Sequence, residues 1–135
     1  MVKRRRGSPQ ARAIGGHSPF ERLVERALAT IPEPFAAALD EVAVVIEDEP
    51  TDDQLRDNGL GPRETLYGLY EGVPRTAYAA DWVAAPNKIS LFRLPLEEDF
   101  ADPNELADEV RRTVVHELAH HLGIDDDRLG ELGWD

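Results

Sequence analysis

The sequence predicts an α+β domain in which a small mixed sheet packs on helices, and three observations support this class. Two segments have apolar residues spaced by three and four, as amphipathic helices do, and they span residues 19–30 and 103–122. Shorter segments rich in β-branched and aromatic residues are typical of strands, and they span residues 42–46, 66–70 and 89–94. No internal repeat is visible, so we expect one domain over residues 18–135.

The helix predicted over residues 103–122 has marked ends. Asp102 precedes Pro103, and Glu105 follows three residues after Asp102, which is the pattern of an N-cap, a proline at the first helical position and a capping-box partner. Gly123 stands where a left-handed turn commonly ends a helix. We therefore expect a continuous helix that stops just before Gly123.

The other segments are predicted from similar local signals. Ser18 and Pro19 give the first helix an N-cap and a first-position proline. A short second helix is expected over residues 35–40, and the acidic segment 47–63 is expected to be a mobile loop. One of the strands at residues 66–70 and 89–94 is expected to offer a sheet edge to an extended peptide, and residues 89–94 are the first choice.

The composition is that of a small soluble domain. With 135 residues, 41% of them hydrophobic, the chain can bury a modest core of its own. It contains no cysteine, which excludes disulfides and thiolate metal ligands. No apolar run reaches the roughly 18 to 20 residues of a membrane span, and the N-terminus lacks the apolar core of a signal peptide. We therefore expect a cytoplasmic monomer without a membrane partner.

Charge is distributed unevenly along the chain. The net charge is −12, but residues 1–12 contain five cationic residues and no acid, so the other 123 residues carry −17. Such an acidic body repels nucleic acids and attracts cationic peptides. We expect residues 1–17 to be a basic, disordered tail, and nucleic acid is expected as a partner of this tail at most.

The strongest chemical signal is the string HExxH at residues 116–120. Residues four apart on a helix point the same way, so His116 and His120 can share one metal ion. Glu117 points to one side of that pair, where a carboxylate can take a proton from a metal-bound water but is poorly aimed at the metal. The alternative is a core helix whose polar residues form this pattern by chance.

A catalytic zinc site usually has three protein ligands and one open position, so the two histidines need a partner. Gly123 lets the chain turn back toward the metal, and Asp126 follows three residues later, at the offset of a third ligand in longer signatures of this kind. A carboxylate oxygen is an acceptable zinc ligand. Asp126 is therefore the first candidate and Asp125 the alternative, while Asp127 is expected to cap a short final helical turn.

Other polar residues near this string have more than one interpretation. Glu109 and Thr113 fall on the side of His116, where they would either orient a metal ligand or lie exposed on a cleft wall. His121 projects toward the apolar arc of the helix, so we expect a buried structural histidine. Four residues are candidates to stabilise an oxyanion, namely Tyr67, Tyr70, Tyr78 and Arg128.

The segment from Val114 to Trp134, VVHELAHHLGIDDDRLGELGW, resembles the signature of the small bacterial zincin-like metallopeptidases of the HExxHxxGxxD type. These are also called minimal zincins or matrix-metalloprotease-like domains. Weaker matching pieces are LYGLYEG at residues 66–72 and ISLFRLPLE at residues 89–97. The resemblance implies a minimal zincin fold from about residue 20 onward, with Glu117 as general base. The zinc ligands that it implies are His116, His120 and Asp126.

The sequence departs from the broader metzincin pattern in two ways. Met1 is the only methionine, so no methionine turn underlies the metal, and nine residues follow Asp126. We therefore expect a shallow, open cleft whose pockets come from upstream loops.

These observations predict a zinc-dependent metallopeptidase that acts on an unidentified peptide or protein. Two alternatives remain open: a non-catalytic or weakly active zinc-binding interaction module, and a metal-dependent nuclease with histidines spaced along a helix. The acidic body argues against the nuclease because it repels phosphates. Glu117 argues against a purely structural zinc site, since such a site needs no base.

Overall fold

The structure is a computed structural model, and it describes residues 2–3, 11–13, 18–72 and 87–134. Helix α5 spans Pro103–Leu122, as the sequence predicts. The Asp102 side chain accepts hydrogen bonds from the backbone N–H groups of Asn104 and Glu105, and Gly123 ends the helix at a φ of 73°. Both ends are therefore fixed by the residues predicted to fix them.

A four-stranded mixed sheet packs on α5. In spatial order its strands are β2 (Ala11–Ala13), β3 (Ala43–Glu47), β6 (Lys88–Phe92) and β5 (Gly68–Glu71). β3 and β6 run parallel, whereas the other neighbouring strands run antiparallel. A separate antiparallel pair joins β1 (Val2–Lys3) to β4 (Thr65–Leu66). The predicted α+β class with a small mixed sheet is confirmed.

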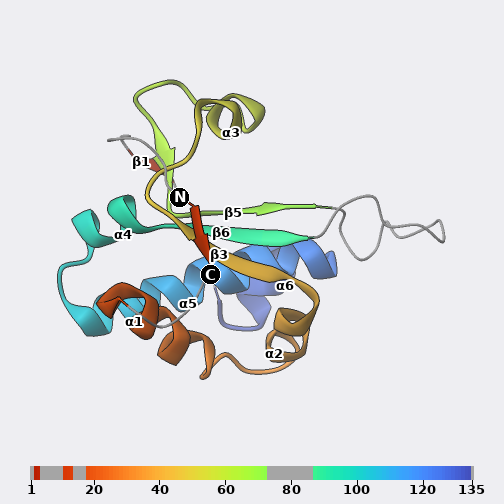
Figure 1. The fold of residues 1–135 in the computed structure, drawn as a ribbon. Helices are drawn as coiled ribbons and strands as arrows, with labels where there is room; N and C mark the ends of the chain where they lie inside the picture. The colour runs from red at the N-terminus through yellow and green to blue at the C-terminus, as the bar shows by residue number, and fades with distance from the viewer. Residues whose placement is uncertain (1, 4–10, 14–17, 73–86, 135) are drawn as a thin grey trace.

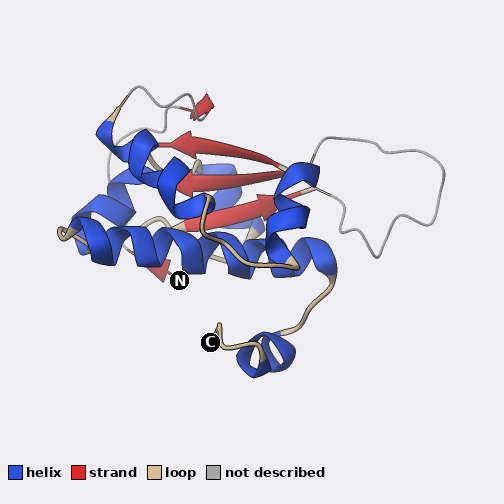
Figure 2. Ribbon diagram, turned by 90° about the horizontal axis from the view of Figure 1, so that it is seen from below, coloured by secondary structure: helices blue, strands red, loops and turns tan. Residues whose placement is uncertain are grey.

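Helices cover one face of the sheet (Figure 1). On this side lie α5, α1 (Pro19–Leu28), α2 (Phe35–Ala38) and the short 3-10 helix η1 (Leu39–Glu41), whereas α3 (Asp52–Asp57) lies beyond the opposite face. α4 (Arg93–Asp99) leads into α5, and α6 (Asp126–Glu131) follows it. Figure 2 shows α5 lying along the sheet.

The core forms between α5 and the sheet. Val114 and Leu118 of α5 are fully buried in one cluster with Ile89 and Leu91 of β6. Each such side chain contributes roughly 1.5–3 kcal/mol on burial. On the same helix His116 is partly buried and His120 is exposed, so neither belongs to this core.

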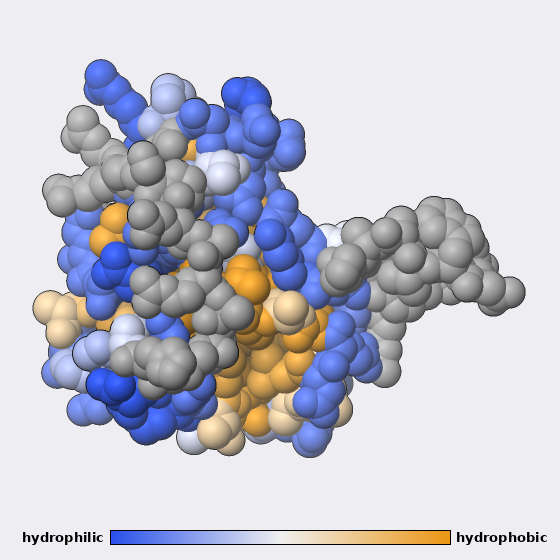
Figure 3. Space-filling model, viewed as in Figure 1, coloured by the Kyte–Doolittle hydropathy of each residue, from blue (hydrophilic) through white to orange (hydrophobic). Residues whose placement is uncertain are grey.

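Few large hydrophobic side chains are exposed on the surface of the described residues. On the face in Figure 3, hydrophobic side chains gather at the centre and polar side chains surround them. Leu132 is nevertheless the one exposed large hydrophobic residue in the described part of the chain. No helix among the described residues is long and apolar enough to cross a membrane.

Part of the predicted tail forms strands. The sequence predicts disorder over residues 1–17, but β1 and β2 lie within this range and pair with β4 and β3. Strands of two or three residues are too short for a visible alternation of apolar and polar positions, so no sequence signal marked them. The other residues of the predicted tail lie outside the described part of the chain.

The prediction of a loop over residues 47–63 is wrong in one part, because α3 lies within it. The Thr51 side chain accepts from the backbone N–H of Gln54, and the Gln54 side chain accepts from the backbone N–H of Thr51. This reciprocal pair is a capping box, which stabilises the first turn of a short helix.

The prediction that residues 89–94 offer a sheet edge is also wrong. β6 lies between β3 and β5, so both of its edges are paired. The strand ends at Phe92, and α4 begins at Arg93. β5 is an edge strand of the sheet and packs against α5. It therefore has the position that we predicted for residues 89–94.

A buried acid lies on the sheet face away from α5. Glu47 is 6% exposed, and its carboxylate lies 3.9 Å from the Lys88 amine. Burial raises the pKa of Glu47 above its ordinary value, although Lys88 opposes this rise. A carboxyl group with a raised pKa in the folded state favours folding when protonated.

Glu47→Gln is therefore expected to reduce how strongly the free energy of unfolding depends on pH. The contribution of Glu47 is fully present below its unfolded pKa and is lost as pH rises through its folded pKa. Urea unfolding at several pH values should show the variant gaining stability relative to wild type as pH rises toward neutral. Glu64→Gln, on the surface, serves as the control. An unchanged difference between variant and wild type across this range would contradict the expectation.

β5 approaches α5 closely because position 68 has no side chain. A Cβ atom on Gly68 would lie 2.5 Å from the Thr113 methyl group and 3.2 Å from the Ser90 carbonyl oxygen. A side chain at position 68 would therefore require the helix or the sheet to move. Gly68 thus determines the distance between the edge strand and the helix of the candidate site.

Gly68→Ala is expected to destabilise the protein by about 1–3 kcal/mol, because the added methyl group overpacks this contact. Gly61→Ala is the matched control, since its Cβ would meet only the Glu64 side chain, at an ordinary 3.6 Å. Urea unfolding of the two variants measures the difference. Equal stabilities would show that the strand and the helix can separate at little cost.

Candidate active site

Glu117 is held in place by the edge strand. Its side chain is 17% exposed, and Oε1 accepts a hydrogen bond of 2.8 Å from the backbone N–H of Tyr70 in β5. Burial raises the pKa of Glu117, while nearby His120 and the Tyr70 N–H oppose the rise. The backbone of β5 thus engages Oε1.

His116 has its tautomer set by a backbone group. Its Nε2 lies 2.6 Å from the carbonyl oxygen of Trp134. A carbonyl only accepts, so Nε2 carries the hydrogen, and in a neutral ring Nδ1 keeps the lone pair. Metal-binding histidines commonly donate their other N–H to a backbone carbonyl, which fixes the ring. In this arrangement Nδ1 is the nitrogen that His116 can offer to a metal.

His120 lies one turn further along α5 and is accessible. Its side chain is 63% exposed, and Nδ1 lies 3.7 Å from Glu117 Oε1. Glu117 and His120 therefore lie close to each other, and His116 precedes His120 by one turn of α5.

A pocket opens beside this face. It has a volume of about 150 Å³, and its lining includes His116, Glu117 and Gly68. The remaining lining residues are Tyr67, Glu109, Arg112 and Thr113. The pocket therefore extends from the candidate base toward the N-terminal half of α5.

Glu109 and Thr113 form one wall of this pocket and are buried, not exposed. The Glu109 carboxylate accepts from the Thr113 hydroxyl at 3.2 Å and from the Arg112 guanidinium at 3.0 Å. Both side chains are under 9% exposed. The sequence left orientation of a ligand and exposure on a cleft wall open, and the structure excludes exposure.

The aspartates after Gly123 have different local roles. Asp125 is the N-cap of α6, and its Oδ1 accepts from the backbone N–H of Arg128 at 2.9 Å. The prediction that Asp127 caps this helix is therefore wrong by two residues. Asp126 is the first residue of α6. Within the described ranges, no three side chains of the metal-binding types are grouped around one point, so the structure does not bring Asp126 to His116 and His120.

The candidates for oxyanion stabilisation are mostly engaged elsewhere. The Tyr67 hydroxyl donates to Asp99, and the Tyr70 hydroxyl lies 3.2 Å from His121. The Arg128 guanidinium lies 3.3 Å from Glu131. Tyr78 lies outside the described residues. Each of the three described candidates therefore has a partner of its own.

His121 is buried, as predicted, at 1% exposed. Its partner Glu41 was not identified from the sequence, and their side chains meet at 2.6 Å across 80 residues of chain. A contact at this separation has no local signal. Only the position of His121 on the apolar side of α5 indicated that a polar partner was needed.

The donor set fits zinc in its chemistry. Two histidines stand four residues apart on α5, one has its tautomer fixed by a carbonyl, and the chain supplies carboxylates just beyond Gly123. Without cysteine, nitrogen and oxygen are the available donors. The Glu117 carboxylate lies 3.7 Å from His120, and His116 and Glu117 both line the pocket.

An α+β domain whose longest helix carries HExxH beside an edge strand and a pocket has the architecture of a zincin. In agreement, the family model of zincin-like metallopeptidases matches residues 39–134. The chain belongs to this family. A comparison with curated proteins gave no match.

Proposed function

We propose that this protein is a zinc-dependent peptidase in which Glu117 is the general base. The hydrogen bond from the Tyr70 N–H to the Glu117 carboxylate carries the proposal. It aims a largely buried carboxylate beside two histidines at the edge of a pocket. Catalytic carboxylates need such fixed positions, and family membership supports the same reaction class.

His116 and His120 would hold the metal ion. Zinc, when bound, lowers the pKa of a coordinated water and polarises the substrate carbonyl. Asp126 is our candidate for the third ligand, because Asp125 is engaged as the cap of α6. This assignment requires the turn after Gly123 to adjust so that Asp126 approaches the histidines.

Glu117 moves the proton in the proposed reaction. Its carboxylate accepts a proton as the water oxygen bonds to the substrate carbonyl carbon. It then delivers that proton to the amide nitrogen as the carbon–nitrogen bond breaks, which releases an amine and a carboxylic acid. A raised pKa suits both steps, since the group must gain and lose a proton near neutral pH.

The edge of β5 is the proposed binding surface for the peptide backbone. The Phe92 N–H donates to the Tyr67 carbonyl, so alternation along the strand turns the backbone groups of Gly68 and Tyr70 away from β6. Gly68 also lines the pocket beside Glu117. An extended peptide paired at Gly68 would therefore pass the base.

A zinc-binding module without catalysis is the second candidate. The contacts of the described oxyanion candidates favour it, because Tyr67, Tyr70 and Arg128 each have another partner. The two candidates differ in whether Glu117 has a chemical role.

Zinc binding is expected to depend on three residues. His116→Ala and His120→Ala should each weaken zinc affinity by more than the roughly 10- to 100-fold typical of losing an outer partner. Asp126→Asn should weaken it similarly. Asp125→Asn is the matched control, because asparagine still caps α6. Competition with a chromogenic chelator measures each affinity. A loss in Asp125→Asn, with Asp126→Asn unaffected, would assign the third ligand to Asp125.

Glu117→Gln is expected to keep zinc and lose hydrolysis. The amide retains the shape of the side chain but cannot take a proton, so cleavage of a peptide library should fall by roughly 10²- to 10⁴-fold. Glu105→Gln, an exposed change in the first turn of the same helix, is the control. If wild-type protein loaded with zinc cleaves no peptide, the non-catalytic module becomes the better account.

A further inference from the structure

His121 is a buried histidine outside the proposed chemistry, yet both of its ring nitrogens have partners. Nε2 lies 2.6 Å from Glu41 Oε1, and Nδ1 lies 3.2 Å from the Tyr70 hydroxyl. A carboxylate only accepts, so Nε2 carries a hydrogen and donates to Glu41. In the neutral ring Nδ1 is then the acceptor for the Tyr70 O–H. The hydrogen bonds therefore run in one direction, from Tyr70 through His121 to Glu41.

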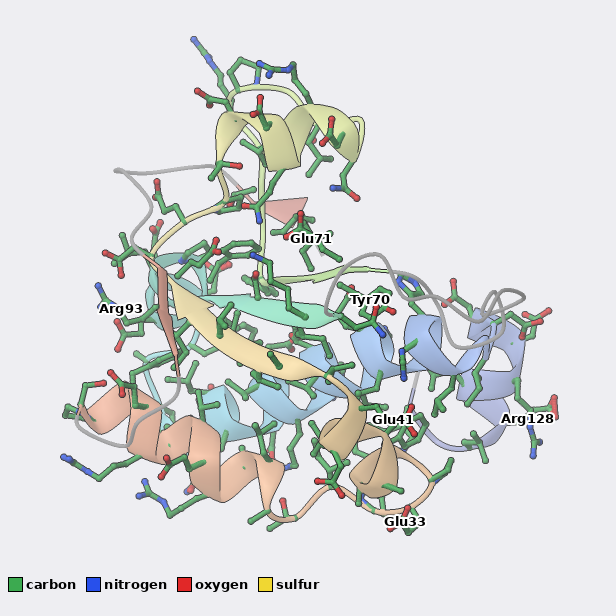
Figure 4. All side chains as sticks on the ribbon, turned by 45° about the vertical axis from the view of Figure 1, so that its right-hand side comes forward. Glu33, Glu41, Tyr70, Glu71, Arg93 and Arg128 are labelled. Carbon is green, nitrogen blue, oxygen red and sulfur yellow. The ribbon has the colours of Figure 1, made fainter. Side chains whose placement is uncertain are left out.

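The three residues come from three separate elements. Glu41 ends η1, Tyr70 lies in β5, and His121 lies near the end of α5. In Figure 4 the labelled Tyr70 and Glu41 both lie near the C-terminal part of α5. The Tyr70 and His121 rings also pack together, with centroids 5.8 Å apart. A connected polar network with a buried member, here His121, helps to fix the relative placement of the elements that it joins.

Tyr70 contacts α5 at two points. Its hydroxyl meets His121, and its backbone N–H donates to Glu117 at 2.8 Å. These two helix residues are four apart, which is about one helical turn. Two contacts one turn apart restrict both the sliding of β5 along α5 and its rotation about the helix. The placement of the Tyr70 N–H thus depends on its own side chain.

We propose that Glu41 and His121 are positioning residues that hold Tyr70, and that Tyr70 in turn aims the carboxylate of Glu117. The catalytic consequence rests on the proposed role of Glu117 as base. The positioning itself is a property of the folded chain, and it can be measured without metal or substrate.

The test compares four variants by NMR of the metal-free, full-length chain. Glu41→Ala and Tyr70→Phe each remove one link of the network. Glu41→Gln is the matched control for the first, because its amide oxygen still accepts from His121 Nε2. Tyr67→Phe is the control for the second, since it removes another tyrosine hydroxyl that bonds to Asp99 and not to His121.

The signal is the backbone amide of residue 70. In Glu41→Ala and Tyr70→Phe its proton should shift upfield and exchange with solvent roughly two- to tenfold faster, as expected for a weakened hydrogen bond. Glu41→Gln and Tyr67→Phe should leave both quantities as in wild type. If Tyr70→Phe does not fold, Glu41→Ala decides, because the Glu41 side chain is already 37% exposed.

Two results would overturn the proposal. In the first, Glu41→Ala lowers the stability of the protein but leaves the chemical shift and exchange rate of the residue 70 amide unchanged. This would mean that the network only supports the fold. The other is an equal effect of Glu41→Gln and Glu41→Ala, which would contradict the hydrogen-bond chain. With a cleavable peptide, kcat should fall about tenfold in Glu41→Ala while KM and zinc affinity stay constant. A chain that cleaves nothing removes the peptidase proposal, but the amide measurement still decides the positioning.

Discussion

The close packing of α5 against β5 is the constraint on which the candidate site depends. Gly68 permits it, because any side chain at that position would overlap Thr113 or the Ser90 carbonyl. The Tyr70 amide then lies within hydrogen-bond distance of Glu117. Burial of core side chains such as Val114 stabilises this packing, but the short distance between strand and helix is what brings the sheet edge to the candidate site.

Elements with strong local signals were predictable from the sequence. α5 begins and ends where its N-cap, its proline and Gly123 indicate, and its 20 residues give the apolar pattern enough turns to be unambiguous. The spacing of His116 and His120 by one turn, with Glu117 to one side, follows from helical geometry alone. α3 was also within reach, since Thr51 and Gln54 have capping-box spacing, but the acidic, glycine-containing surroundings favoured a loop.

Features that depend on tertiary contacts were not predictable. The spatial order of strands decides which of them is an edge, and the apolar run of β6 fits a strand paired on both sides as well as one paired on a single side. Glu41 is 80 residues from His121, and the Trp134 carbonyl belongs to the backbone, so neither partner has a sequence pattern. Among three consecutive aspartates, only the folded turn shows that Asp125 is the cap.

The contact between Glu117 and Tyr70 also bears on self-association. Exposed edge strands can recruit strands of other molecules, which leads to aggregation. On the outer side of β5 the Tyr70 N–H is already bonded to a carboxylate, so an incoming strand would lose one rung of its ladder there. Continuous pairing is thus limited to a short stretch near Gly68. This hydrogen bond therefore discourages sheet-to-sheet polymerisation, and the peptide proposed to bind at β5 would pair over a short stretch only.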